Sequence, residues 1–77
     1  MRGTTKKHLR LKLWEEYVGV LREVICKNGV VKLVFEGDAV IIDGEAETFK
    51  RLINCKIGLL RTDSDTQAYR IRVLAHA

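Results

Sequence analysis

The stretch EEYVGVLREVICKNGVVKLVFE, residues 15–36, decides the fold that the sequence predicts. Its first half carries an apolar stripe with the spacing of one helix face, formed by Tyr17, Val18, Leu21, Val24 and Ile25. Two glutamates precede the stripe and Lys27 ends it, which suits the dipole of a helix. The Asn28-Gly29 pair that follows tolerates the left-handed backbone that ends many helices. We therefore expect a helix over residues 15–27, followed by a strand over residues 30–36.

The segments that flank this stretch predict two further strands. Residues 8–14 alternate between apolar and basic side chains, which is typical of a strand with one solvated face. A turn at residues 36–38 leads into a strand over residues 39–43. The strands over residues 30–36 and 39–43 therefore predict a hairpin on the C-terminal side of the first helix.

The last third of the chain predicts a second helix and a second hairpin. Asp43 can cap this helix, whose apolar face holds Ala46, Phe49, Leu52 and Ile53. Residues 57–61 and 67–75 then predict two strands joined by a polar turn at residues 62–66. The helix could instead continue through residue 60, at a cost of roughly 1 kcal/mol for the glycine at position 58.

An internal similarity supports this order of elements. With an offset of 29 residues, residues 15–43 align on residues 44–72, and the identities include Arg22 with Arg51, Cys26 with Cys55 and Gly29 with Gly58. The order is then β(αββ)2 with a pseudo-twofold repeat. It predicts an α+β two-layer sandwich, an antiparallel or mixed sheet backed by two helices. Without the last hairpin the order becomes βαββαβ, a ferredoxin-like layout.

Length and composition place limits on the class of protein. A chain of 77 residues that is 47% hydrophobic and 31% charged is typical of one small globular domain. Such a chain buries only about 60% of its unfolded surface, so association with a second copy would add stability. We find no apolar run long enough to cross a bilayer and no secretory signal. Two cysteines in that context indicate a reducing compartment, and we expect a cytoplasmic protein.

The positive charge is concentrated at the N-terminus. The formal net charge is +4, and the first twelve residues contain five basic residues and no acidic one. We interpret residues 1–7 as a flexible basic arm and residues 8–77 as a single small α/β domain. An arm of this kind is typical of nucleic-acid binding, and the alternative is a solvated tail that keeps the protein soluble. The predicted interface is Arg2, Lys6, Lys7, Arg10, Lys12, Arg61, Arg70 and Arg72.

Other residue types that carry chemistry do not form a recognisable motif. His8, Cys26, Cys55 and His76 lack the short spacings of metal ligands, so we expect no metal and no cofactor. The two cysteines could form a disulfide if the ends of the two helices meet. An acidic group could serve acid–base chemistry or hold a divalent cation, but its members suit turns and helix caps: Glu36, Asp38, Asp43, Glu45 and Glu47. We therefore expect no catalytic residue.

The hypothesis that follows is a small non-enzymatic domain that contacts the backbone of DNA or RNA, acts as a homo-oligomer and has no contact with a membrane. Trp14 is the one aromatic residue that could stack on a base, although we expect it in the core. The alternative is a protein-interaction subunit or homo-oligomeric module with no nucleic-acid contact. It rests on residues 30–35, which carry apolar side chains on both faces of the predicted strand.

Overall fold

The structure, a computed structural model, describes residues 7–76 and consists of one six-stranded sheet with a single short helix. The elements are β1 (Lys7–Leu9), β2 (Glu16–Lys27), β3 (Val30–Phe35), β4 (Asp38–Ile42), α1 (Ala46–Lys50), β5 (Lys56–Arg61) and β6 (Tyr69–Ala75). Their spatial order is β1-β4-β3-β2-β5-β6. Only the β1–β4 pair is parallel.

The predicted fold class is therefore wrong, because the chain is mostly β and is not a sandwich backed by two helices. The neighbouring strands β3, β4, β5 and β6 lie within two residues of the expected ranges, whereas residues 15–27 form β2 instead of a helix. The β(αββ)2 order and its ferredoxin-like alternative are both excluded by this strand. The two segments that align in sequence also differ in structure, since Cys26 lies in β2 and Cys55 precedes β5.

A bulge in β2 explains the helix-like spacing of its apolar residues. Leu21 pairs with Phe35, but the next partners are Glu23 with Val34, so Arg22 is the extra residue. Such a bulge shifts the side-chain alternation by one position. Leu21 and Val24 consequently face the same side of the sheet although they are three residues apart. The β-branched and aromatic residues of this segment also favour a strand over a helix.

The Asn28-Gly29 pair forms a two-residue hairpin turn between β2 and β3. Both residues have a positive φ, 54° and 77°. A type I′ turn needs this conformation at both central positions, and its twist matches that of the two flanking strands. The dipeptide that we assigned to the end of a helix therefore closes a hairpin.

The second predicted helix is reduced to the five residues of α1. Glu45 occupies its N-cap position without a side-chain cap hydrogen bond, so Asp43 is not the cap that we expected. After α1 the chain turns and meets β2: the Asn54 amide donates to the Leu21 carbonyl at 2.6 Å, and the Leu21 amide donates to the Cys55 carbonyl at 3.0 Å. These main-chain bonds to β2 replace the bonds that a longer helix would make.

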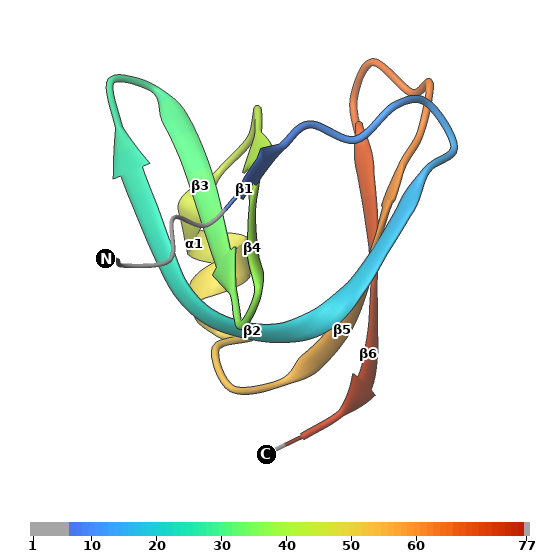
Figure 1. The fold of residues 1–77 in the computed structure, drawn as a ribbon. Helices are drawn as coiled ribbons and strands as arrows, with labels where there is room; N and C mark the ends of the chain where they lie inside the picture. Colours follow the sequence, from blue (N-terminus) through green and yellow to red (C-terminus); the bar gives the residue numbers. More distant parts are fainter. Residues whose placement is uncertain (1–6, 77) are drawn as a thin grey trace.

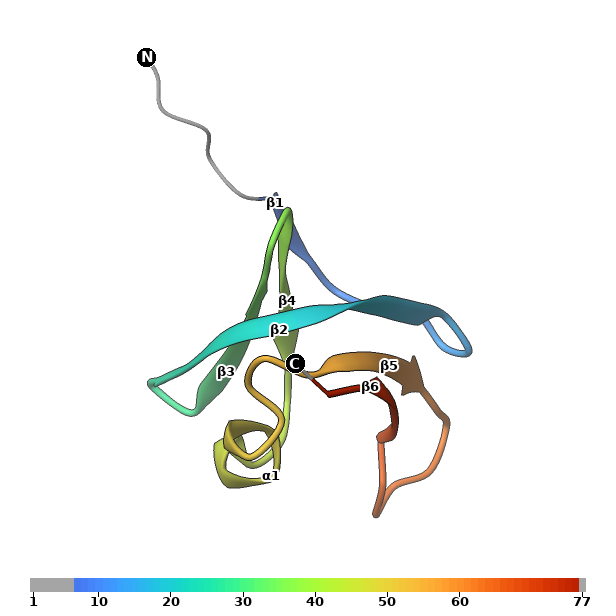
Figure 2. The ribbon, with the colours of Figure 1, turned by 90° about the horizontal axis from the view of Figure 1, so that it is seen from below.

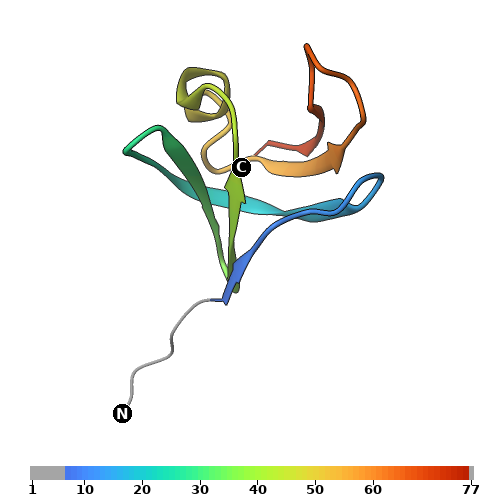
Figure 3. The same ribbon diagram turned by 90° about the horizontal axis from the view of Figure 1, so that it is seen from above.

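The sheet folds over on itself around β2, which spans both halves of the molecule (Figure 1). The N-terminal half of β2 pairs with β5 and its C-terminal half pairs with β3. Views from below and above show α1 and β6 on one side of β2 and β1 on the other (Figures 2 and 3). The core lies between the two halves, where the buried apolar residues include Leu21, Leu33, Phe35, Ile42, Phe49, Ile57 and Leu59.

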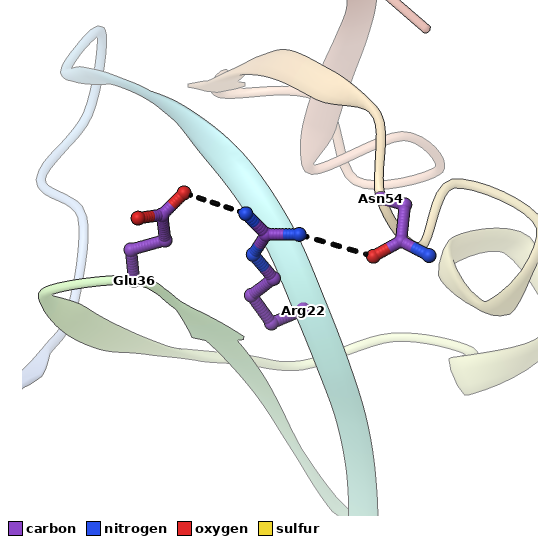
Figure 4. A network of polar contacts seen from close by, with 3 residues as sticks. All are labelled: Arg22, Glu36 and Asn54. Atoms are coloured by element: carbon purple, nitrogen blue, oxygen red, sulfur yellow. Dashed lines mark hydrogen bonds and ion pairs between the residues drawn. The ribbon is translucent and has the colours of Figure 1, made fainter. Parts of the chain in front are cut away.

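Arg22, the extra residue of the bulge, connects the two halves on the outside of the bend (Figure 4). Its guanidinium donates to the Glu36 carboxylate at 2.8 Å, just after β3, and to the Asn54 side-chain oxygen at 3.2 Å, just before β5. Both side chains of the ion pair are largely exposed, so its contribution to stability is about 0 to 1 kcal/mol.

Candidate nucleic-acid interface

The predicted basic residues do not all lie on one surface. Arg2 and Lys6 lie outside the described residues. Lys7 belongs to β1, where its backbone lies opposite Asp38 in the parallel pairing with β4. β1 and β6 occupy opposite ends of the strand order, so Lys7 and the arginines of β6 do not share a sheet edge. Arg10 follows β1 and is exposed. The interface therefore divides into the N-terminal end and a second group close to β5 and β6.

The chain between β1 and β2 leads from the first group to the second. The strand predicted over residues 8–14 ends at Leu9, and the chain then crosses the open side of the sheet (Figure 1). Leu11 is buried in the core on the way. Residues 12–15 then form a turn, in which the Glu15 amide donates to the Lys12 carbonyl at 2.9 Å.

This turn holds two large apolar side chains in solvent. Leu13 is 57% exposed and Trp14 is 61% exposed, so the expectation that Trp14 lies in the core is wrong. The φ of Trp14 is 65°, the value that the third residue of a type II turn requires and that glycine usually supplies. Three further hydrogen bonds hold the turn: the Lys12 amide to a Glu15 carboxylate oxygen, the Trp14 amide to the Arg61 carbonyl, and the Arg61 amide to the Glu15 carbonyl.

Arg61 is anchored by Tyr69 on the neighbouring strand. Its guanidinium carbon lies 5.3 Å from the centre of the Tyr69 ring, and one terminal nitrogen donates to the Tyr69 hydroxyl at 3.4 Å. The loop that joins β5 and β6 is closed beside this pair, because the Thr62 hydroxyl donates to the Gln67 carbonyl at 2.7 Å. Arg61 is thus half-buried and mainly fixes the end of β5 next to the turn at residues 12–15.

Arg70 and Arg72 lie on the outer face of β6. The register places Arg70 beside Leu60 and Arg72 beside Gly58. Across β5, the same face continues with Glu16 and Val18 of β2. A shallow hollow of about 270 Å³ on this face is lined by Glu16, Leu60, Arg70, Ile71 and Arg72.

One of these arginines already has an acidic partner. Arg72 donates to the Glu16 carboxylate at 2.8 Å, and the pair crosses β5 above Gly58. A Cβ atom at position 58 would lie 2.9 Å from a carboxylate oxygen of Glu16, so glycine leaves room for this contact. Within residues 7–76, the side chain of Arg70 forms no such ion pair. Of the two arginines of β6, Arg70 is therefore the one more available to an external anion.

The predicted acidic group is dispersed in the structure. Asp38 accepts a hydrogen bond from the Tyr17 hydroxyl, Glu36 binds Arg22, and Glu47 binds Lys50. The other two residues, Asp43 and Glu45, line a cavity of about 450 Å³ together with Asp65, Thr66 and Tyr69. Among the residues described, no three His, Cys, Asp or Glu side chains are close enough to hold a metal ion.

The two cysteines are separate and free, so the disulfide that we considered is not formed. Cys26 is exposed in β2, whereas Cys55 is buried. The Cys55 sulfur lies 3.5 Å from Nδ1 of His76, beyond the end of β6.

Sequence reasoning missed two features of this surface. The first is the turn at residues 12–15, because a leucine and a tryptophan are not turn residues and the only signal was the following glutamate pair. The second is the pairing of Glu16 with Arg72, which joins residues far apart in the sequence and depends on the register of three strands.

Comparisons with known proteins assign this chain to no family. No family model, no curated protein and no solved structure matches this chain. In the part of the chain that the structure describes, the one helix is far too short to span a bilayer.

Proposed function

We propose that this protein is a cytoplasmic, non-enzymatic domain that binds the phosphate backbone of nucleic acid. The observation that carries the proposal is the exposed outer face of β6, where Arg70 and Arg72 alternate along an edge strand. Lys12, in the turn that is bonded to the end of β5, adds a further cation, and the sequence of the N-terminal arm contributes Arg2 and Lys6.

Phosphate contacts need charge and reach but no base-specific geometry. Each lysine or arginine that neutralises a phosphate releases condensed counterions, so log K falls with log salt by about 0.7 to 0.9 per contact. If Arg70, Arg72 and Lys12 each contact one phosphate, the slope contributed by this surface is about −2 to −3.

A salt titration of binding to a fluorescent oligonucleotide tests the proposal. The double variant Arg70→Ala/Arg72→Ala should weaken binding and reduce the magnitude of the slope by about 1.4 to 1.8. The double variant Lys50→Ala/Arg51→Ala removes the same charge at the end of α1, outside the proposed interface, and serves as the matched control. Equal losses in both variants would show that only net charge matters, and no binding at about 50 mM salt would refute the proposal.

The arm is tested by truncation. Deletion of residues 1–6 leaves β1 intact and removes Arg2 and Lys6. We expect weaker binding and a smaller salt slope. Unchanged affinity would exclude the arm from the interface while leaving the role of β6 open to the first test.

A second candidate function, docking to another protein, is favoured by the outer face of β2, β3 and β4. Ile25, Val30 and Ile41 form an apolar hollow of about 200 Å³ on that face, with Lys27 and Lys32 at its rim. Two copies stacked through this face would bring like charges together, so the chemistry fits a partner with an acidic rim. Light scattering separates the cases: a dimer that Ile41→Glu dissociates would assign this face to self-association instead.

A further inference from the structure

We infer that the turn at residues 12–15 is a base-stacking platform that makes the interface select single-stranded over double-stranded nucleic acid. The inference rests on the proposed function and adds the class of ligand. It starts from Trp14, the only tryptophan in the chain, which the structure holds out of the core.

The backbone of Trp14 is held in a conformation that disfavours its side chain. A left-handed φ brings Cβ of an L-residue close to the following carbonyl and costs roughly 1 to 2 kcal/mol. Such strain persists only where the surroundings fix it, and it is concentrated at functional sites. Here four hydrogen bonds fix the turn, two within it and two to Arg61 of β5. Glycine would satisfy the same bonds without the strain.

The other aromatic residues all serve the fold. Tyr17 and Phe35 pack against each other with ring centroids 4.6 Å apart, and Phe49 is buried. The ring of Tyr69 contacts the guanidinium of Arg61. A tryptophan supplies more apolar area than any of them, and a small domain gains most by burying it. Its exposure beside an exposed leucine therefore indicates a surface that contacts a ligand.

The charge around the turn selects the kind of ligand. Lys12 belongs to the turn, and Arg70 lies two strands away from Glu16, roughly 10 Å at the usual strand spacing. An aromatic face with one cation in its own turn and others on a nearby strand matches a base and its neighbouring phosphates. In a duplex the faces of the bases are already stacked, so only a single strand or an unpaired loop offers a base to Trp14.

The test compares a single strand with its duplex of the same sequence at about 50 mM salt. The emission of Trp14 in the intact protein should be quenched by the single strand and not by the duplex. Removal of the ring by Trp14→Gly should weaken single-strand binding by roughly 5- to 150-fold, the usual range for loss of one stacked base. Duplex affinity should stay within about twofold, since the phosphate contacts remain.

Trp14→Gly is the informative variant because glycine accepts a φ of 65° and the domain should melt at a higher temperature. Trp14→Phe should retain part of the single-strand affinity because it keeps an aromatic face, whereas a variant of an exposed apolar residue outside the interface, Ile53→Ala, should change nothing.

The outcomes separate this inference from the proposed function. If Arg70→Ala/Arg72→Ala weakens binding to both forms and Trp14→Gly weakens neither, backbone binding stands and the platform is refuted. If the intact protein binds neither form, both ideas fail. A blue shift of Trp14 emission that grows with protein concentration in the absence of oligonucleotide would assign the turn to self-association and overturn the inference.

Discussion

Replacement of Tyr17 by phenylalanine probes one polar contact that spans the two halves of the sheet. The Tyr17 hydroxyl of β2 donates to the Asp38 carboxylate of β4 at 3.0 Å, while its ring packs on Phe35. Phenylalanine keeps the ring and removes only the hydroxyl. A hydrogen bond to a charged group contributes about 1.5 to 3 kcal/mol, and partial exposure of this one lowers the expected cost to about 1 kcal/mol.

The same contact predicts a dependence on pH. Burial raises the pKa of Tyr17 from its ordinary value of 10.0 to about 12, and the hydrogen bond to Asp38 and its negative charge act in the same direction. The folded state therefore favours the neutral phenol. This contribution to the free energy of unfolding is complete below pH 10 and is lost as the pH rises from 10 to 12. A shift of two units corresponds to about 2.7 kcal/mol, which solvent screening reduces to about 1 kcal/mol for this partly exposed group.

Urea unfolding at pH 7 and pH 11.5 measures both effects. With a slope of about 1 kcal/mol per molar urea, Tyr17→Phe should lower the midpoint at pH 7 by about 1 M. The difference between the two proteins should narrow at the higher pH. Tyr69→Phe is the matched control, because its hydroxyl accepts only a long bond of 3.4 Å from Arg61. Equal effects of the two replacements, or a constant difference across pH, would refute the role assigned to Asp38.

Three further replacements test the fold and the interface. Phe49→Ala removes the one buried side chain of α1 and should cost about 3 to 5 kcal/mol, enough to abolish the cooperative melt followed by circular dichroism; a retained melt would contradict the packing. Gly29→Ala should lower the melting temperature because its φ is 77°, whereas Gly37→Ala, which also meets open space, should not; equal effects would contradict the turn type. Glu16→Gln should free Arg72 and raise oligonucleotide affinity severalfold at about 50 mM salt, and unchanged affinity would show that the ion pair does not restrain this arginine.

The strand that the local pattern predicts without an alternative is the one over residues 30–35, which is rich in β-branched residues and lies between two turns. The strand over residues 57–61 had a helical alternative, which the glycine at position 58 disfavoured. In β2 a bulge placed Leu21 and Val24 three residues apart on one face, which imitates the period of a helix. The Asn28-Gly29 pair was the signal that could have corrected the assignment, because it is typical of a hairpin between apolar runs.

The interface could be predicted only in part for a similar reason. Alternation in the last strand correctly separates the exposed Arg70 and Arg72 from the half-buried Tyr69 and Ile71. The sequence does not contain the register that brings Glu16 across β5 to Arg72. It also has no signal for a tryptophan at a positive φ, since that conformation is imposed by bonds to a distant strand.

Because β2 pairs with β5 through its N-terminal half and with β3 through its C-terminal half, the two pairings are expected to form at different stages of folding. The β2–β3–β4 meander is closed by two-residue turns, so its contacts are local and can form within microseconds. The pairing of β2 with β5 joins residues 16–20 to residues 56–60 and requires closure of a long loop. We expect the transition state to contain the meander, with the bulge at Arg22 already formed and β5 still unpaired. Replacements in the Asn28-Gly29 turn should then slow folding, whereas replacements in β6 should mainly accelerate unfolding.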